Sequence, residues 1–250
     1  MLRLRSLLAA LAIGAAVIVP ALPRAAAAVP ASAAQLQTLE AALNSDSDVT
    51  PLLQAGPGLD PTLLELRRRS LRRQFPDARW QLRAGAPLRD GRPTVLVTVT
   101  GSRSDGPSQY RLEATQLLTL ESSGGRISGQ SVIREQSMLR SGEAALPVSL
   151  LIPDAVLTGQ SYDVDVVFDQ PLDGAVAAGG IVALTPQQVA ALESPDLQLG
   201  ALGGGGLFKT VQAPLSPGSQ TWAVLLVHPE GIVSATKRVR VVADKAQLNP

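Results

Sequence analysis

The sequence predicts an α+β protein in which N-terminal helices are wrapped by a curved antiparallel sheet and are followed by a β-sandwich. Its length of 250 residues, of which 45% are hydrophobic, allows two packed cores. Helix start signals dominate the first third of the chain, and long segments with two-residue alternation follow them. The remaining chain shows short apolar runs separated by turn residues, which is typical of a sandwich.

A secretory signal peptide is predicted for residues 1–33. A basic start precedes the apolar run Leu7–Val19, and small residues follow it. Cleavage after Ala28 or after Ala33 suits this pattern, and the second site is preferred. An uncleaved anchor is the alternative, but the run is short for a spanning helix and ends at Pro20. We therefore expect export to the periplasm, the thylakoid lumen or the outside of the cell.

An α+β domain is predicted for residues 34–140. Leucines at helical spacing indicate a helix over Ala34–Leu43, and Thr50 opens a short turn. Asp60 is the expected N-cap of the main helix, which runs to about Phe75, because a proline in the first turn needs no N–H partner. Alternation then indicates strands that begin at Trp80, at Val95, at Tyr110 and at Ile127.

A second, all-β domain is predicted for residues 141–250. Strand-like runs recur there, namely Val148–Ile152, Tyr162–Phe168, Ala175–Leu184, Leu197–Leu199, Leu207–Gln212, Thr221–Val227 and Ile232–Val242. About seven short strands with regular turns favour an immunoglobulin-like sandwich. Thr185 with Gln188 forms a capping box that predicts one short helix within it.

A basic face is the main candidate interaction surface. The main helix carries five arginines, Arg67, Arg68, Arg69, Arg72 and Arg73. They favour an acidic protein partner or, as an alternative, a peripheral contact with an anionic membrane. A solvated outer helix face is the preferred explanation of these arginines, and no nucleic-acid partner is expected because no aromatic residues are interleaved with them.

Composition excludes several kinds of chemistry. The chain has no cysteine and one histidine, so disulfides, thiolate nucleophiles and cysteine or multi-histidine metal sites are excluded. His228 lies in a turn sequence and is expected to be structural. The net charge of +1 belongs to the signal segment, since the chain after residue 33 has 19 basic and 21 acidic residues.

Two motifs resemble ligand sites without meeting their requirements. Gly203–Thr210 is glycine-rich, but a phosphate loop needs glycine directly before lysine, and Leu207 and Phe208 intervene. Asp163, Asp165, Asp169 and Asp173 could gather calcium, but they lack the spacing of a calcium loop. We therefore expect no cofactor and no metal.

Four segments resemble an uncharacterised group of exported cyanobacterial proteins, some of which are labelled nuclear transport factor 2-like. These segments are Phe75–Gln81, Leu88–Pro93, Ile152–Gly159 and Gly203–Lys209. The resemblance implies a helix-lined, cystatin-like half-cone that holds a small ligand or mediates dimerisation. It brings no known catalytic motif.

These observations predict a non-enzymatic exported protein that binds or scaffolds a protein partner, or holds a small apolar ligand in the half-cone. The alternative from another class is a metal-independent enzyme that uses carboxylate acid–base chemistry. Its candidate residue is Glu113 or Glu135, each on a long predicted strand. Such an enzyme predicts a buried carboxylate with a raised pKa in a closed pocket.

Overall fold

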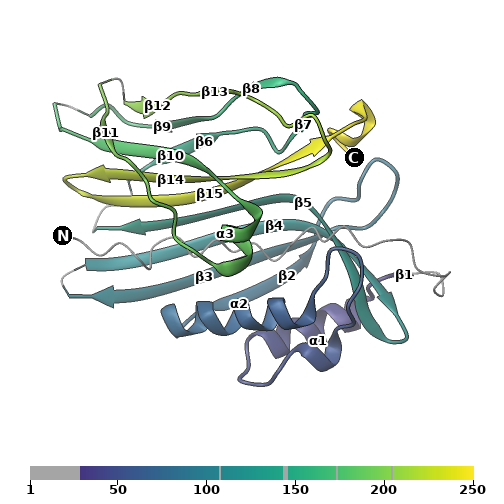
Figure 1. The fold of residues 1–250 in the computed structure, drawn as a ribbon. Helices are drawn as coiled ribbons and strands as arrows, with labels where there is room; N and C mark the ends of the chain where they lie inside the picture. The colour runs from purple at the N-terminus through teal and green to yellow at the C-terminus, as the bar shows by residue number, and fades with distance from the viewer. Residues whose placement is uncertain (1–28, 107, 143–145, 173, 204) are drawn as a thin grey trace.

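The computed structural model describes residues 29–106, 108–142, 146–172, 174–203 and 205–250. Strands make up 49% of these residues and helices 17%. The protein is therefore mostly β, and Figure 1 shows one large twisted sheet running through it.

The large sheet is antiparallel along its whole path, in the order β11-β10-β14-β15-β5-β4-β3-β2. Two short strands lie off this path: β1 pairs with β4, and β7 pairs in parallel with β15. The bounds are β1 Val29–Pro30, β2 Arg79–Ala84, β3 Val95–Asp105, β4 Ser108–Ser123, β5 Arg126–Ser141, β7 Ala155–Leu157, β10 Ala178–Leu184, β11 Gly200–Ala201, β14 Gly218–His228 and β15 Gly231–Val242.

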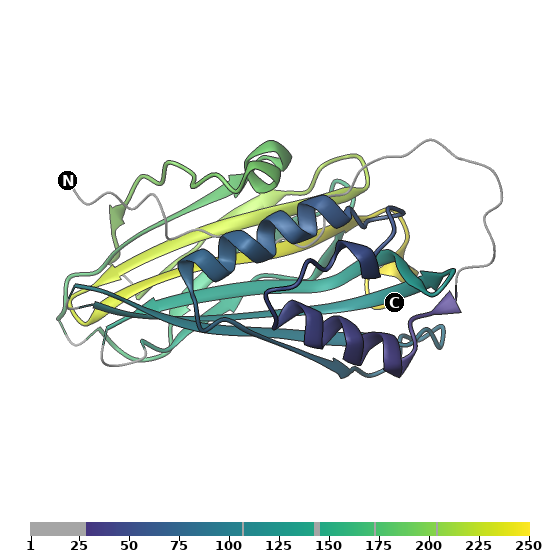
Figure 2. The ribbon, with the colours of Figure 1, turned by 90° about the horizontal axis from the view of Figure 1, so that it is seen from below.

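The α-helices lie on one face of this sheet, which we call the helix face (Figure 2). They are α1 (Ala33–Leu43), α2 (Pro61–Gln74) and α3 (Pro186–Ala191). Single 3-10 turns occur at Thr50–Leu52 and Lys245–Gln247. Ser32, Asp60 and Thr185 cap the three α-helices by accepting a backbone N–H bond, as expected of short polar side chains at N-caps.

Two small sheets cover the opposite face, here called the outer face, over the C-terminal strands. One has the order β12-β9-β6 and the other pairs β13 with β8. Their strands are β6 Val148–Leu151, β8 Ser161–Asp163, β9 Asp165–Phe168, β12 Gly206–Leu207 and β13 Thr210–Gln212. One apolar core joins these sheets to β14 and β15, and Val166, Trp222 and Val233 are among its buried members.

The predicted fold class is wrong. The expected half-cone closing around helices and the expected separate immunoglobulin-like sandwich are replaced by one sheet that contains strands from both halves of the chain. The reason is the pairing of β5 with β15, from Glu135↔Arg238 to Arg140↔Val233. That pairing joins residues about a hundred positions apart, and no local pattern reveals it.

Most individual elements are confirmed. The helices over 34–43, 60–75 and after Thr185, and the four strands of the first half, occur at the expected places within a few residues. In the second half, the expected strand over Tyr162–Phe168 is divided into β8 and β9, and none forms at Leu197–Leu199. The division into domains 34–140 and 141–250 stays a prediction. Its boundary falls at the end of β5, a strand that pairs with β15 of the second half in one sheet.

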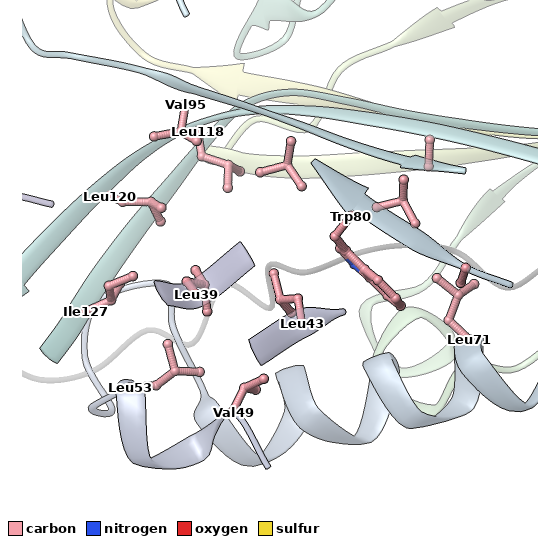
Figure 3. Packing of buried hydrophobic residues seen from close by; sticks show 14 of the residues in the cluster. Leu39, Leu43, Val49, Leu53, Leu71, Trp80, Val95, Leu118, Leu120 and Ile127 are labelled. Atoms are coloured by element: carbon pink, nitrogen blue, oxygen red, sulfur yellow. The ribbon is translucent and has the colours of Figure 1, made fainter. Parts of the chain in front are cut away.

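Side chains fill the space between the helices and β2–β5 (Figure 3). Leu39 and Leu43 of α1, Leu71 of α2 and Trp80 of β2 belong to a continuous buried cluster there. Burying such side chains stabilises the fold by roughly 1.5–3 kcal/mol each. The region expected to hold an apolar ligand is thus part of the packed core.

Candidate functional site

A groove lies where the two layers of the molecule meet on the outer face. Its floor is formed by β4 and β5, its wall is β6, and its volume is about 380 Å³. A volume of this size is within the usual range for binding sites. The residues that line it are Glu113, Thr115, Gln136, Ser137, Met138, Arg140, Val148, Ser149, Leu150 and Leu151.

The wall of the groove is a sheet edge that no other described strand covers. β6 pairs with β9 on one side and ends the three-stranded sheet. The bond from Asp169 N–H to the Pro147 carbonyl continues this ladder. Because bonded and non-bonded pairs alternate along antiparallel strands, the main-chain groups of Val148 and Leu150 point away from β9. These groups therefore face the open edge.

The outer face of β4 and β5 carries like charges on neighbouring strands where Arg140 lines the groove and Arg111 lies beside it. Arg111 of β4 lies directly opposite Arg140 of β5, and Glu113 lies opposite Met138. Arg140 Nε is buried without a hydrogen-bond partner in the described part of the chain. The guanidinium of Arg111 donates one long bond of 3.4 Å to the Gly142 carbonyl. Like charges directly opposite each other destabilise a sheet, so this pair favours an anion beside it.

Of the five arginines predicted as one basic face, four line a common depression and Arg67 does not. Arg67 and Arg68 are buried, with 6% and 5% of their surface exposed. Nevertheless, Arg68 joins Arg69, Arg72 and Arg73 in lining a shallow depression of about 620 Å³ beside Leu66, together with Asp46 and Pro76. Arg69 pairs with Glu65 and Asp48, and Arg72 pairs with Asp46. Acidic neighbours thus offset much of the expected positive charge.

Arg68 has a structural role in the loop that follows α1. Its guanidinium binds both carboxylate oxygens of Glu65 at 2.8 Å. It also donates to the carbonyls of Ser45 at 2.7 Å and Ser47 at 2.9 Å. The hydrogen bond from Arg68 is the main reason that the pKa of Glu65 is lowered.

Arg67 belongs to a buried charged cluster on the helix face. Gln116 donates to Glu135 at 2.7 Å, and Arg238 lies 3.5 Å from the same carboxylate. Burial raises the pKa of Glu135, although Arg238, Gln116 and Arg67 oppose the shift. Burial also lowers the pKa of Arg67, whose Nη2 donates to the carbonyl of Val189 in α3.

The two candidate catalytic carboxylates lie on opposite faces of the sheet. Glu135 is opposite Gln116, whereas Glu113 is opposite Met138, three residues further along β5. Since alternate side chains of a strand point to opposite faces, Glu135 lies under the helices and Glu113 lies in the groove. The two groups therefore cannot share a substrate as an acid–base pair.

The remaining candidate residues have structural roles. His228 Nδ1 accepts the N–H of Glu230 within the β14–β15 turn. Asp163 accepts from Thr210, and Asp165 accepts from the Lys209 N–H, so both join neighbouring strands. Among the described residues, no cluster of three or more acidic or histidine side chains could hold a metal, and Asp173 lies outside those residues.

Part of the glycine-rich motif forms a strand. Gly206–Leu207 is β12, which pairs with β9, so the segment is used in the small sheet. None of the helices in the ranges that the structure covers is long and apolar enough to cross a membrane.

The comparisons with known proteins concern the C-terminal part. Residues 143–242 match the profile of a family described as "Domain of unknown function (DUF8623)". No curated protein matches the chain. The matched segment runs from the approach to β6 to the end of β15. The groove therefore combines a wall inside the matched segment with a floor outside it.

The sequence interpretation missed the groove and its charged pair. Arg111, Glu113 and Arg140 alternate on the polar sides of β4 and β5, and this pattern was a usable signal. Their alignment was not predictable, because two register shifts interrupt the β4–β5 pairing. A hairpin closed at Gly124–Gly125 without these shifts would place Met138 opposite Arg111.

Proposed function

We propose that this protein is an exported, non-enzymatic binding protein that holds a partner protein in the groove between β4–β5 and β6. The observation that carries the proposal is the open edge of β6 beside a polar groove. Native proteins usually cover or blunt such edges, and a partner segment would cover this one. The carboxylate enzyme has less support: Glu135 has the expected burial and raised pKa, but its carboxylate is held by Gln116 and Arg238 and lines neither the groove nor the depression beside α2.

Site-specific photo-crosslinking in the producing cells tests this function. The photoreactive residue p-benzoylphenylalanine would replace Leu151, which is 60% exposed in the groove wall. The matched controls replace Leu66, 50% exposed beside the α2 arginines, and Leu215, 84% exposed after β13. We expect a discrete protein adduct from position 151 alone.

The three positions separate the competing functions. An adduct from position 66 with none from 151 would move the interaction to the α2 arginines and overturn the proposed site. Lipid adducts at position 66 would favour the peripheral membrane alternative. No adduct at any position would contradict a protein-binding function.

A further inference from the structure

The wall of the groove has the geometry of a template for one more strand. Val148 and Leu150 direct main-chain N–H and C=O groups to the open edge of β6, as the alternation of its pairing with β9 requires. The side chain of Val148 is buried in the core, so β6 is held in place by packing. An extended segment can add to such an edge through main-chain hydrogen bonds, while side-chain contacts set its specificity.

The floor of the groove supplies the charge that selects the segment. Arg111 and Arg140 face each other, and with Glu113 they leave a net positive charge on this part of the outer face. The buried Nε of Arg140 lacks a hydrogen-bond partner within the described ranges. Arginine binds carboxylates through paired N–H groups, which are stronger than neutral hydrogen bonds. A carboxylate beside both arginines would relieve the repulsion between them.

We propose that β6 accepts an extended acidic segment of a partner protein as an additional strand, with a carboxylate bound by Arg111 and Arg140. This inference rests on the proposed function and specifies the partner's chemistry. The added strand would lie over the outer face of β4 and β5, next to the residues that line the groove.

Labelled peptides test the inference directly. The probe is an eight-residue peptide of alternating threonine and valine with one central aspartate, and its matched forms carry asparagine or lysine instead. Fluorescence anisotropy with the full purified protein measures each Kd. We expect the aspartate peptide to bind about tenfold more tightly than the asparagine peptide, because a charge-assisted bond is stronger. We expect the lysine peptide to bind most weakly.

Main-chain pairing is tested with two N-methylated forms of the aspartate peptide. One form is methylated at every even-numbered amide and the other at every odd-numbered amide. An added strand donates only alternate N–H groups to its neighbour, so one form should bind and the other should not. Equal binding of both forms would overturn strand addition.

Two substitutions test the charged pair. Arg140→Gln should reduce the aspartate preference to less than about twofold, and Arg111→Gln should reduce it in the same direction. Arg83→Gln is the matched control, because Arg83 is exposed on β2 and does not line the groove. An unchanged preference in both groove variants, with the fold intact by circular dichroism, would overturn the assigned carboxylate site.

The peptide and cross-linking experiments distinguish failure of this inference from failure of the proposed function. A protein adduct at Leu151 without any acidic preference would overturn this inference and leave the binding function standing. Absence of both results would contradict the two proposals together.

Discussion

The adjacent residues Arg67 and Arg68 of α2 are both buried but have different hydrogen-bond partners, because successive helical residues are rotated by about 100° around the helix axis. Arg68 satisfies Glu65 and two loop carbonyls. Arg67 enters a cluster that already contains Arg238 and Glu135. Its Nε and Nη1 are buried without hydrogen-bond partners in the described part of the chain. Burial of charge thus stabilises the structure only where the charge is fully paired.

Methionine substitutions should show that Arg67 and Arg68 contribute differently to the free energy of unfolding. Arg68→Met should lower the free energy of unfolding by about 3–5 kcal/mol, because it leaves buried Glu65 without its main partner. Arg67→Met should change it by less than about 1 kcal/mol, because relief of burying an incompletely paired charge offsets the lost bond to Val189. Urea unfolding measures both values. Similar losses in the two variants would contradict this assignment.

Two buried glutamates should affect stability with opposite pH dependence. The pKa of Glu65 is lowered by Arg68, so its stabilisation is present above the ordinary value of 4.5 and is lost as the pH falls through the folded pKa. The pKa of Glu135 is raised by burial, so stability falls as the pH rises above 4.5 towards the folded pKa.

Glutamine variants can verify these signs. Relative to the unmodified protein, Glu65→Gln should lose less stability on acidification, and Glu135→Gln should lose less as the pH rises through the raised pKa of Glu135. The measurement is the free energy of unfolding by urea between about pH 3 and pH 7, a range that spans the ordinary carboxyl pKa values. Parallel pH profiles in both variants would disprove the opposite signs.

At the level of secondary structure, the first described residues are integral to the sheet and to α1. Val29 and Pro30 pair with the end of β4, and the Ala31 N–H bonds to the Leu120 carbonyl. Ser32 caps α1 in a reciprocal capping box with Gln35. Such a cap contributes about 1 kcal/mol.

The processing site should follow from these contacts. Cleavage after Ala33, the site preferred from the sequence, would remove β1 and the cap of α1, whereas cleavage after Ala28 would keep both. We expect the mature N-terminus at Val29, as determined by mass spectrometry of the protein from its native cells. An N-terminus at Ala34 would refute this expectation.

Ser32→Ala should lower the free energy of unfolding by about 1 kcal/mol, because it removes the side-chain cap of α1.

For the whole molecule, the pairing of β5 with β15 connects two cores that lie in different parts of the chain. Ser137 and Thr236 share a buried hydrogen bond of 2.6 Å at this junction. Trp80 belongs to the core under α1 and α2, and Trp222 belongs to the core under the small sheets. Each tryptophan therefore reports on one core.

We expect both cores to unfold together. In single-tryptophan variants, Trp222→Phe leaves Trp80 as the probe and Trp80→Phe leaves Trp222. Thermal unfolding by circular dichroism first gives each variant its own midpoint. The fluorescence midpoint should match it in both variants, because separating the cores would expose the paired edges of β5 and β15. Fluorescence and circular dichroism midpoints that differ would instead indicate two domains that unfold independently on either side of the predicted boundary.

Short-range sequence signals were sufficient to predict most helices and strands of this protein. The caps Asp60 and Thr185 and the alternation after Trp80 predicted helices and strands at the places where they occur. These signals act over a few residues, so the sequence displays them directly. Alternation also placed Glu113 and Glu135 on long strands.

Tertiary structure alone decided the strand order, the position of the groove and which of the α2 arginines are buried. Glu135 and Ser137 are polar on the helix face because Arg238 and Thr236 meet them there from β15. Register shifts in the β4–β5 pairing bring Arg111 opposite Arg140. Such pairings depend on residues far apart in the chain, whose alignment is set by the packing of both layers. The sequence thus specified the individual strands, and long-range pairing determined which of them form the large sheet and which form the small sheet that ends at β6.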